Sequence, residues 1–179
     1  MSNLAFTMSK ATAAFSKWQS QYAEVCIPTF PVDVERKKPM LRGYDKIGLR
    51  ASLELAQNPR FKEHDGFGFC GKRAGIVIVD IDAPGDSILA DTLAEYGQTP
   101  IIVRTPSGGH HLWFRHSGEG RQIRPDASKP VDILGGGYVV APPSRRGLLG
   151  YEMIQGRLED VSSLPKCKRP PSGKLKYTD

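Results

Sequence analysis

Two aspartates lie on one face of the most apolar strand that the sequence predicts, Ile76-Val77-Ile78-Val79-Asp80-Ile81-Asp82. Because side chains alternate along a strand, Asp80 and Asp82 point the same way, with Cα atoms about 6.6 Å apart. Aspartate is depleted in strands, and two like charges on one face repel each other. A hard divalent cation such as Mg²⁺ or Mn²⁺ turns that repulsion into binding. The plainer alternative is that both acids lie in a solvated turn before Pro84.

A third aspartate, Asp132, lies between Val131 and Ile133 in another apolar segment. If this segment is a strand beside the first, the spacing of about 4.8 Å between strands places Asp132 next to the other two acids. Carboxylates that converge in this way hold one cation, or two about 3.5–4 Å apart. The pattern therefore predicts a metal site made of Asp80, Asp82 and Asp132.

A turn of small residues, Ser107-Gly108-Gly109, has the composition of an anion site. Glycines let backbone N–H groups approach an anion closely, and the serine adds a side-chain donor. His110 and His111 follow in a predicted strand, so they point to opposite faces and one of them joins the carboxylates. We therefore expect a phosphate site beside the metal site, with a plain hairpin turn as the alternative.

Basic residues near these motifs are candidates for further phosphate contacts. Arg104 precedes the turn, and the run Arg36-Lys37-Lys38 is expected in a loop before Pro39. Composition alone favours a solvated charged loop for that run.

Short strands and amphipathic helices must position these residues. Apolar residues at steps of three and four predict a first helix, capped by Thr7 or Ser9; its stripe is Met8, Ala11, Phe15, Trp18, Tyr22 and Val25. Further helices are predicted over 49–57 and 86–96, and strands over 26–30, 66–70, 76–82, 101–104, 110–114, 131–134 and 138–141. Three glycines, 135–137, predict that the last two strands form a hairpin. The fold class is α+β, with antiparallel hairpins and helices on one side.

Length and composition set the outer limits of the interpretation. The 179 residues fit one domain, predicted over 1–165, with a basic flexible tail or linker over 166–179. The net charge of +6 is compatible with a phosphate-bearing partner. No run of about 18 apolar residues occurs, which excludes a membrane span. The absence of a signal-peptide pattern, and three cysteines without a Cys-x-x-Cys pair, favour a cytoplasmic location.

Three motifs, in order and in spacing, resemble the bifunctional DNA primase/polymerase domain of the archaeo-eukaryotic primase superfamily, which is found on plasmids, phages and integrated elements. The motifs are Asp80-Ile81-Asp82-Ala83-Pro84, then Thr105-Pro106-Ser107-Gly108-Gly109-His110-His111-Leu112, then Val131-Asp132-Ile133 with Gly137-Tyr138-Val139-Val140-Ala141-Pro142-Pro143-Ser144. The resemblance spans roughly residues 12–165, and includes Lys37-Lys38-Pro39 and Tyr151-Glu152.

The resemblance implies a catalytic core with an RNA-recognition-motif-like antiparallel sheet and an N-terminal α/β layer. It implies a DNA primase or DNA polymerase in which Asp80, Asp82 and Asp132 bind two Mg²⁺ or Mn²⁺ ions. The nucleotide-binding residues are then expected to be Ser107, Gly108, Gly109, His111, Lys38 and Arg104. His111 is preferred to His110 because the family has one variable residue between the second glycine and its histidine. The implied partners are a single-stranded DNA template or primer-template, a dNTP or NTP, and a replicative helicase, fused or separate.

Two other classes of function compete with this interpretation. A non-catalytic module that binds single-stranded nucleic acid would use exposed aromatic residues for stacking, and has no need of three acids facing a phosphate backbone. A metal-dependent nuclease would use the same carboxylates to cleave phosphodiesters. The phosphate turn and the histidine favour a triphosphate substrate instead.

Overall fold

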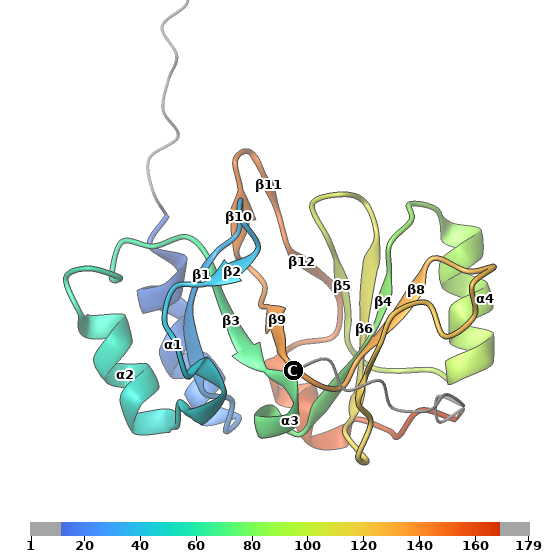
Figure 1. Cartoon of the computed structure of the whole chain (residues 1–179), viewed down its shortest axis with the longest axis horizontal. Helices are drawn as coiled ribbons and strands as arrows, with labels where there is room; N and C mark the ends of the chain where they lie inside the picture. Colours follow the sequence, from blue (N-terminus) through green and yellow to red (C-terminus); the bar gives the residue numbers. More distant parts are fainter. Residues whose placement is uncertain (1–11, 169–179) are drawn as a thin grey trace, which may run out of the picture.

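The computed structural model describes residues 12–168 and arranges them around two antiparallel sheets (Figure 1). The larger sheet has six strands in the order β12-β5-β6-β4-β8-β7, so β4 is central. Its strands are β4 (Ile76–Ile81), β5 (Ile102–Arg104), β6 (His110–Arg115), β7 (Arg121–Gln122), β8 (Val131–Leu134) and β12 (Glu152–Gln155).

The smaller sheet has four strands in the order β2-β1-β3-β9 and is built mainly from the N-terminal part of the chain. Its strands are β1 (Thr29–Asp33), β2 (Lys38–Pro39), β3 (Phe67–Cys70) and β9 (Tyr138–Val140). A separate two-stranded hairpin, β10 (Arg145–Arg146) with β11 (Leu149–Gly150), projects at the top of the view in Figure 1. The α+β class is confirmed, while the RNA-recognition-motif likeness of the larger sheet stays an implication of the resemblance.

Helices α1 (Ala14–Glu24) and α2 (Leu49–Gln57) cover the outer side of the smaller sheet, and α4 (Asp86–Tyr96) covers the outer side of the larger sheet (Figure 1). The short helix α3 (Gly71–Ala74) connects β3 to β4, and two 3-10 turns, η1 (Tyr44–Lys46) and η2 (Leu158–Ser163), complete the described elements. Helices α1 and α2 pack on one face of the smaller sheet, where Gln19 Nε2 and the Thr29 N–H both donate to Ser52 Oγ, at 3.3 and 3.0 Å. The helices predicted over 49–57 and 86–96 are confirmed as α2 and α4.

Alternation along β4 divides the core in two. Val77, Val79 and Ile81 point to one side and pack beneath α4 with residues of β6 and β8. Ile76 and Ile78 point to the other side, into a core shared with the smaller sheet. Asp80 lies two residues after Ile78 and is therefore on the face of β4 that points toward the smaller sheet.

The strands around the triglycine do not form the hairpin that the sequence predicts. β8 pairs with β4 and β7 in the larger sheet, whereas β9 pairs with β3 in the smaller one. The three glycines form the crossing between the sheets. A Cβ at Gly135 would lie 2.2 Å from the Glu119 carbonyl oxygen, so glycine is required there for a close backbone approach rather than for a tight turn.

The first helix begins later than its apolar stripe predicts. α1 starts at Ala14, and its N-cap residue Ala13 has a φ of 53° and no side-chain cap. Thr12 binds Asp65 Oδ1 through its N–H and its hydroxyl, at 2.6 and 2.7 Å. The predicted cap by Thr7 or Ser9 is wrong; those residues, with Met8 and Ala11, lie outside the described residues.

The first strand is also displaced, by three residues, to begin at Thr29. After α1 the chain turns through Cys26, which has a φ of 61° and whose N–H donates to Ala23 O. Residues 26–28 are therefore used to leave the helix and are not part of the sheet.

The packed chain continues past residue 165. The Arg115 N–H donates to Pro165 O, and the Lys168 N–H donates to Tyr96 O at the end of α4, both at 2.8 Å. Cys167 packs against the core beneath α4. Residues 166–168 are therefore in contact with the rest of the fold, whereas residues 169–179 lie outside the described range, and the tail over 166–179 stays a prediction. Within residues 12–168, no helix has the length and hydropathy needed to cross a bilayer.

Candidate active site

Strand register places three of the predicted site residues in one row across the larger sheet. Asp80 on β4 pairs with His111 on β6 and with Asp132 on β8. Directly paired residues of antiparallel strands share a face of the sheet. All three side chains therefore lie on the same side as Ile78 and Trp113, toward the smaller sheet. The prediction that the strand of Asp132 neighbours that of Asp80 is confirmed.

Asp82 lies one residue beyond the end of β4 and is exposed. Its N–H donates to Pro130 O at 2.8 Å, which continues the pairing with the residue that precedes β8. The backbone of Asp82 is thus held in register two residues after Asp80. The strand ends between the two acids, so the alternative of a turn holds only for Asp82.

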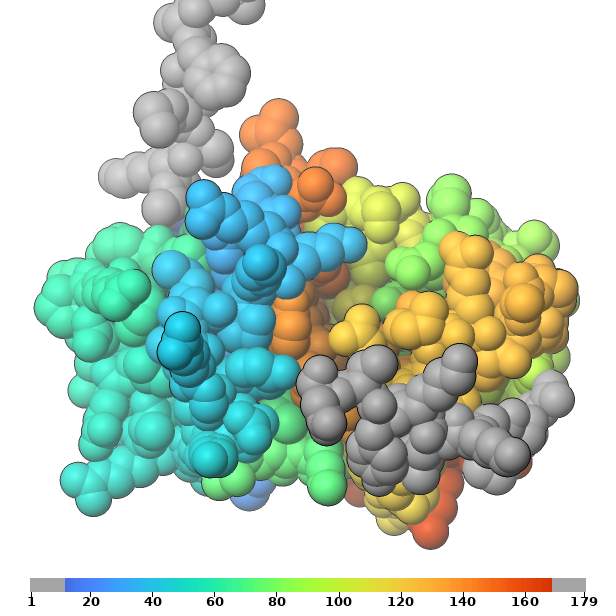
Figure 2. Space-filling view, in the orientation of Figure 1, coloured from blue at the N-terminus to red at the C-terminus, as the bar shows by residue number. Residues whose placement is uncertain are grey.

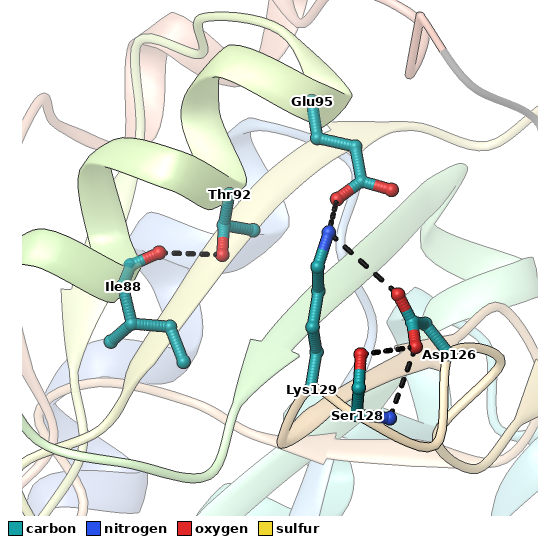
Figure 3. A network of polar contacts seen from close by, with 6 residues as sticks. All are labelled: Ile88, Thr92, Glu95, Asp126, Ser128 and Lys129. Atoms are coloured by element: carbon teal, nitrogen blue, oxygen red, sulfur yellow. Dashed lines mark hydrogen bonds and ion pairs between the residues drawn. The ribbon is translucent and has the colours of Figure 1, made fainter.

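The segment that precedes β8, residues 126–129, is held against α4 by a polar network (Figure 3). Lys129 Nζ lies 2.6 Å from Glu95 Oε2 on α4 and 3.8 Å from Asp126 Oδ2. Asp126 Oδ1 in turn accepts from the N–H and the hydroxyl of Ser128, at 3.0 and 2.6 Å. The turn before Pro130 is therefore held to α4 through Lys129, and Pro130 O in turn accepts from the Asp82 N–H.

The pKa of Asp80 is strongly raised by its position in the site. Burial, then the charges of Asp82 and Asp132, raise its pKa to about 7, against a smaller opposing effect of Lys37 and Arg121. Asp132, in contrast, has a backbone hydrogen-bond donor, because its Oδ1 accepts from the Arg124 N–H at 2.8 Å. In the absence of a metal, Asp80 therefore holds its proton below about pH 7 and is ionised above it.

His111 is a neutral imidazole at the same place. Its Nε2 lies 3.4 Å from Asp80 Oδ1, and its side chain is almost fully buried. Burial, assisted by the positive charge of Lys37, lowers the pKa of His111 to about 4. The contact with Asp80 is consequently not an ion pair at neutral pH. His111 Nδ1 is buried without a hydrogen-bond partner in the described residues.

The predicted phosphate turn closes the β5–β6 hairpin next to this row. The Thr105 N–H donates to Gly109 O, and the Gly108 N–H donates to Thr105 O, both at 2.9 Å. Ser107 is exposed, and its hydroxyl lies 3.1 Å from Thr105 Oγ1. The Gly108 N–H is therefore already bonded within the turn. The exposed Ser107 hydroxyl is the side-chain group of the turn that we expect to donate to a ligand.

Replacing Gly109 by Ala should destabilise the protein strongly. A Cβ at this position would lie 2.1 Å from Ile81 O, so β4 and β6 would have to separate beside Asp80. We expect a loss of about 2–3 kcal/mol in the free energy of unfolding, measured by urea denaturation. Gly150→Ala is the control, because its Cβ would meet only ordinary contacts at 3.4 Å or more. Equal stability of the two variants would contradict the tight packing at Gly109.

Two of the predicted phosphate-binding residues are not brought to the carboxylates. Arg104 pairs with His110, on the opposite face from His111, and its Nη2 lies 2.5 Å from Glu152 Oε2. Lys38 is exposed on β2, at the outer edge of the smaller sheet. Its neighbour Lys37 affects the titration of both Asp80 and His111 instead. The basic run 36–38 therefore influences the site electrostatically through Lys37 and not through the predicted Lys38.

Tyr151 falls within the resemblance described above, but its place in the site becomes visible only in the structure. Its ring centroid lies 5.7 Å from that of His111, and the side chain is 8% exposed. Burial and the nearby Asp80 raise the pKa of Tyr151 to about 12, so it stays protonated. Tyr151 backs His111 on the side away from Asp80's strand partner Asp132 and restricts the position of the imidazole.

Beside the turn there is a pocket of about 630 Å³. Its walls are the 105–108 turn, the β10–β11 hairpin and Tyr151. Figure 2 also shows the surface hollowed between the β1–β2 segment, in blue, and the segment around β8, in gold. The carboxylate row thus lies between a basic N-terminal layer and an open phosphate turn.

The charges around the aspartates fit a divalent metal. Within residues 12–168, no lysine or arginine forms an ion pair with Asp80, Asp82 or Asp132, although burial and mutual repulsion raise the pKa of Asp80. The same residues contain no cluster of three or more His, Cys, Asp or Glu that forms a metal site by itself. Mg²⁺ usually takes one or two carboxylates and fills its other positions with water and substrate phosphates. A metal that binds at these aspartates together with a nucleotide therefore stays a prediction.

The family model for the bifunctional DNA primase/polymerase N-terminal domain matches residues 19–167. The match covers most of the chain, and the protein belongs to this family. Members are nucleotidyltransferases of the DNA primase/polymerase type, so DNA and nucleotides are their substrates. The carboxylate row and the phosphate turn both fall within the matched residues. No curated protein matches the chain.

Proposed function

We propose that this domain adds nucleotides to a primer, or initiates one, on a single-stranded DNA template. The observation that carries the proposal is the pairing of Asp80 with both Asp132 and His111. It puts a concentrated negative charge next to a neutral imidazole and to the 105–109 turn. This combination suits a substrate that is a metal-bound triphosphate.

Asp80, Asp82 and Asp132 would hold two Mg²⁺ or Mn²⁺ ions. When bound, such ions lower the pKa of an attacking 3′-hydroxyl and neutralise the triphosphate and its leaving group. The neutral His111 would donate a hydrogen bond to a phosphate oxygen, and the Ser107 hydroxyl would do the same from the turn. Tyr151 packs against the imidazole, and Ile78 and Trp113 form the next buried pair along the same face of the sheet.

The two competing functions predict different products from the same mixture. Primed and unprimed single-stranded DNA is incubated with dNTPs, NTPs and Mg²⁺ or Mn²⁺. Extension or new synthesis supports the proposal, degradation indicates a nuclease, and retention of unchanged DNA indicates a binding module. The mixture also shows which nucleotide is preferred and whether a primer is needed.

Replacing His111 by Ala should weaken nucleotide binding more than DNA binding. Loss of a hydrogen bond to a charged phosphate costs about 1.5–3 kcal/mol, so we expect affinity for a non-hydrolysable dNTP analogue to fall about 10- to 100-fold. His110→Ala is the matched control, because His110 is equally buried but points to the opposite face. Calorimetric titration measures both variants, and thermal melting checks that they are folded. Equal losses of nucleotide affinity would show that the register assigned to β6 is wrong.

A further inference from the structure

The tip of the β10–β11 hairpin exposes two adjacent leucines. Leu148 is 80% exposed and Leu149 is 61% exposed, more than any other large apolar side chain of residues 12–168. Covering one leucine fully is worth about 1.5–3 kcal/mol, so this tip is a strong candidate for contact with a partner. Single exposed leucines are common, but a neighbouring pair on a projecting hairpin is not explained by packing.

The hairpin is held in a defined position. Arg145 Nη2 donates to Leu148 O across the turn at 3.0 Å. Arg146 Nε lies 3.2 Å from Glu35 Oε2 in the loop between β1 and β2. At the base of the hairpin, the Tyr151 N–H donates to Ser144 O at 2.8 Å. These contacts hold the hairpin that carries the two leucines, and the chain continues from the hairpin directly into Tyr151 of the site.

The hairpin also forms one wall of the 630 Å³ pocket beside the phosphate turn. Arg145, Leu148 and Leu149 line one side, and Thr105 and Gly108 line the other. Figure 1 shows the hairpin at the same edge of the molecule as the β5–β6 turn. A molecule seated on the leucines would consequently lie next to a nucleotide bound at the turn.

The surroundings of the leucines are positively charged. The exposed basic residues on this hairpin and on the adjacent β1–β2 segment are Arg36, Lys37, Lys38, Arg145 and Arg146. They outnumber the acids of the same two segments, Asp33 and Glu35. Apolar tips flanked by cations suit nucleic acid, because the apolar side chains pack against bases while the cations contact phosphates.

We infer that the β10–β11 hairpin holds the single-stranded template, with Leu148 and Leu149 packed against its bases and Arg146 near its phosphates. The inference rests on the proposed function, since it places the template beside the incoming nucleotide. The hairpin then aligns the templating base with the 105–109 turn. It acts by positioning and takes no part in the chemistry.

The test compares two double variants of the full chain. Leu148→Gln/Leu149→Gln removes the apolar tip, and Leu49→Gln/Leu53→Gln removes two exposed leucines of α2, which lies away from the site (Figure 1). We expect the hairpin variant to bind a fluorescein-labelled oligothymidine about tenfold more weakly. The α2 variant should bind like the wild type, and both should bind a non-hydrolysable dNTP analogue normally.

A second comparison isolates the charge. Arg146→Gln should reduce the slope of log affinity against log salt by about 0.7. Arg50→Gln, which also breaks a surface pair with a glutamate, should leave the slope unchanged.

Unchanged DNA affinity in the leucine variant overturns the inference. A loss confined to the dNTP analogue also overturns it, and assigns the leucines to the nucleotide. The binding assays need no turnover, so they separate this inference from the proposed function. A wild-type protein that degrades DNA, combined with weaker DNA binding by the hairpin variant, would retain the hairpin and reject the polymerase.

Discussion

Asp82→Asn is expected to abolish nucleotide addition and to leave the fold intact. The change removes the charge of one metal ligand and keeps the shape of the side chain. Stabilisation of the transition state by a bound metal is worth several kcal/mol, so the rate should fall about a thousandfold or more. The fold should survive, because Asp82 is exposed and its link to Pro130 is made by the backbone. Single-turnover primer extension measures the rate, and circular dichroism checks the fold.

Asp91→Asn is the matched control for this variant. Asp91 is an exposed aspartate on α4. The Asp91→Asn variant should extend primers at the wild-type rate. If Asp82→Asn also extended at that rate, the assignment of Asp82 as a metal ligand would be wrong.

Asp80→Asn should be inactive and yet more stable than the wild type at neutral and alkaline pH. The buried carboxyl has its pKa raised to about 7 in the folded protein, while in the unfolded chain it titrates near its ordinary value of about 3.9. Between these values the folded state binds more protons than the unfolded state. Stability contributed by this group is therefore present below about pH 4 and lost as the pH rises through 7. Asparagine removes that loss.

The gain should reach roughly 2–4 kcal/mol above pH 8, by the usual conversion of a pKa difference into free energy. It should shrink toward zero near pH 4. Urea denaturation in metal-free buffer at pH 4, 6 and 8 measures it, with Asp91→Asn expected to show no such pH dependence. A stability difference that does not change with pH would contradict the account of a strained carboxylate cluster.

The chemistry of β4 could be predicted because strand alternation is a local property. Asp80 and Asp82 stand out as acids at the end of an apolar segment. Alternation places His110 and His111 on opposite faces, and the resemblance to the family selects His111. The pairing of Asp132 with Asp80 needed one assumption, that their strands are neighbours, and the structure bears it out.

Other features depend on contacts between distant parts of the chain. A triglycine between two apolar segments signals either a tight turn or a close backbone approach, and only the packing at Glu119 decides for the second. Tyr151 reaches His111 through the order of strands in the larger sheet. The face on which Arg104 lies depends on its pairing with His110, which puts it opposite His111, and it lines the pocket beside the 105–108 turn.

Anomalous diffraction from crystals grown with Mn²⁺ and a non-hydrolysable dNTP tests the central claim most directly, since it locates the metal without relying on activity. We predict manganese peaks in contact with the carboxylates of Asp80, Asp82 and Asp132, and triphosphate density against Ser107 and His111. A nucleotide bound elsewhere, or manganese bound with the nucleotide but away from the three aspartates, would contradict the account.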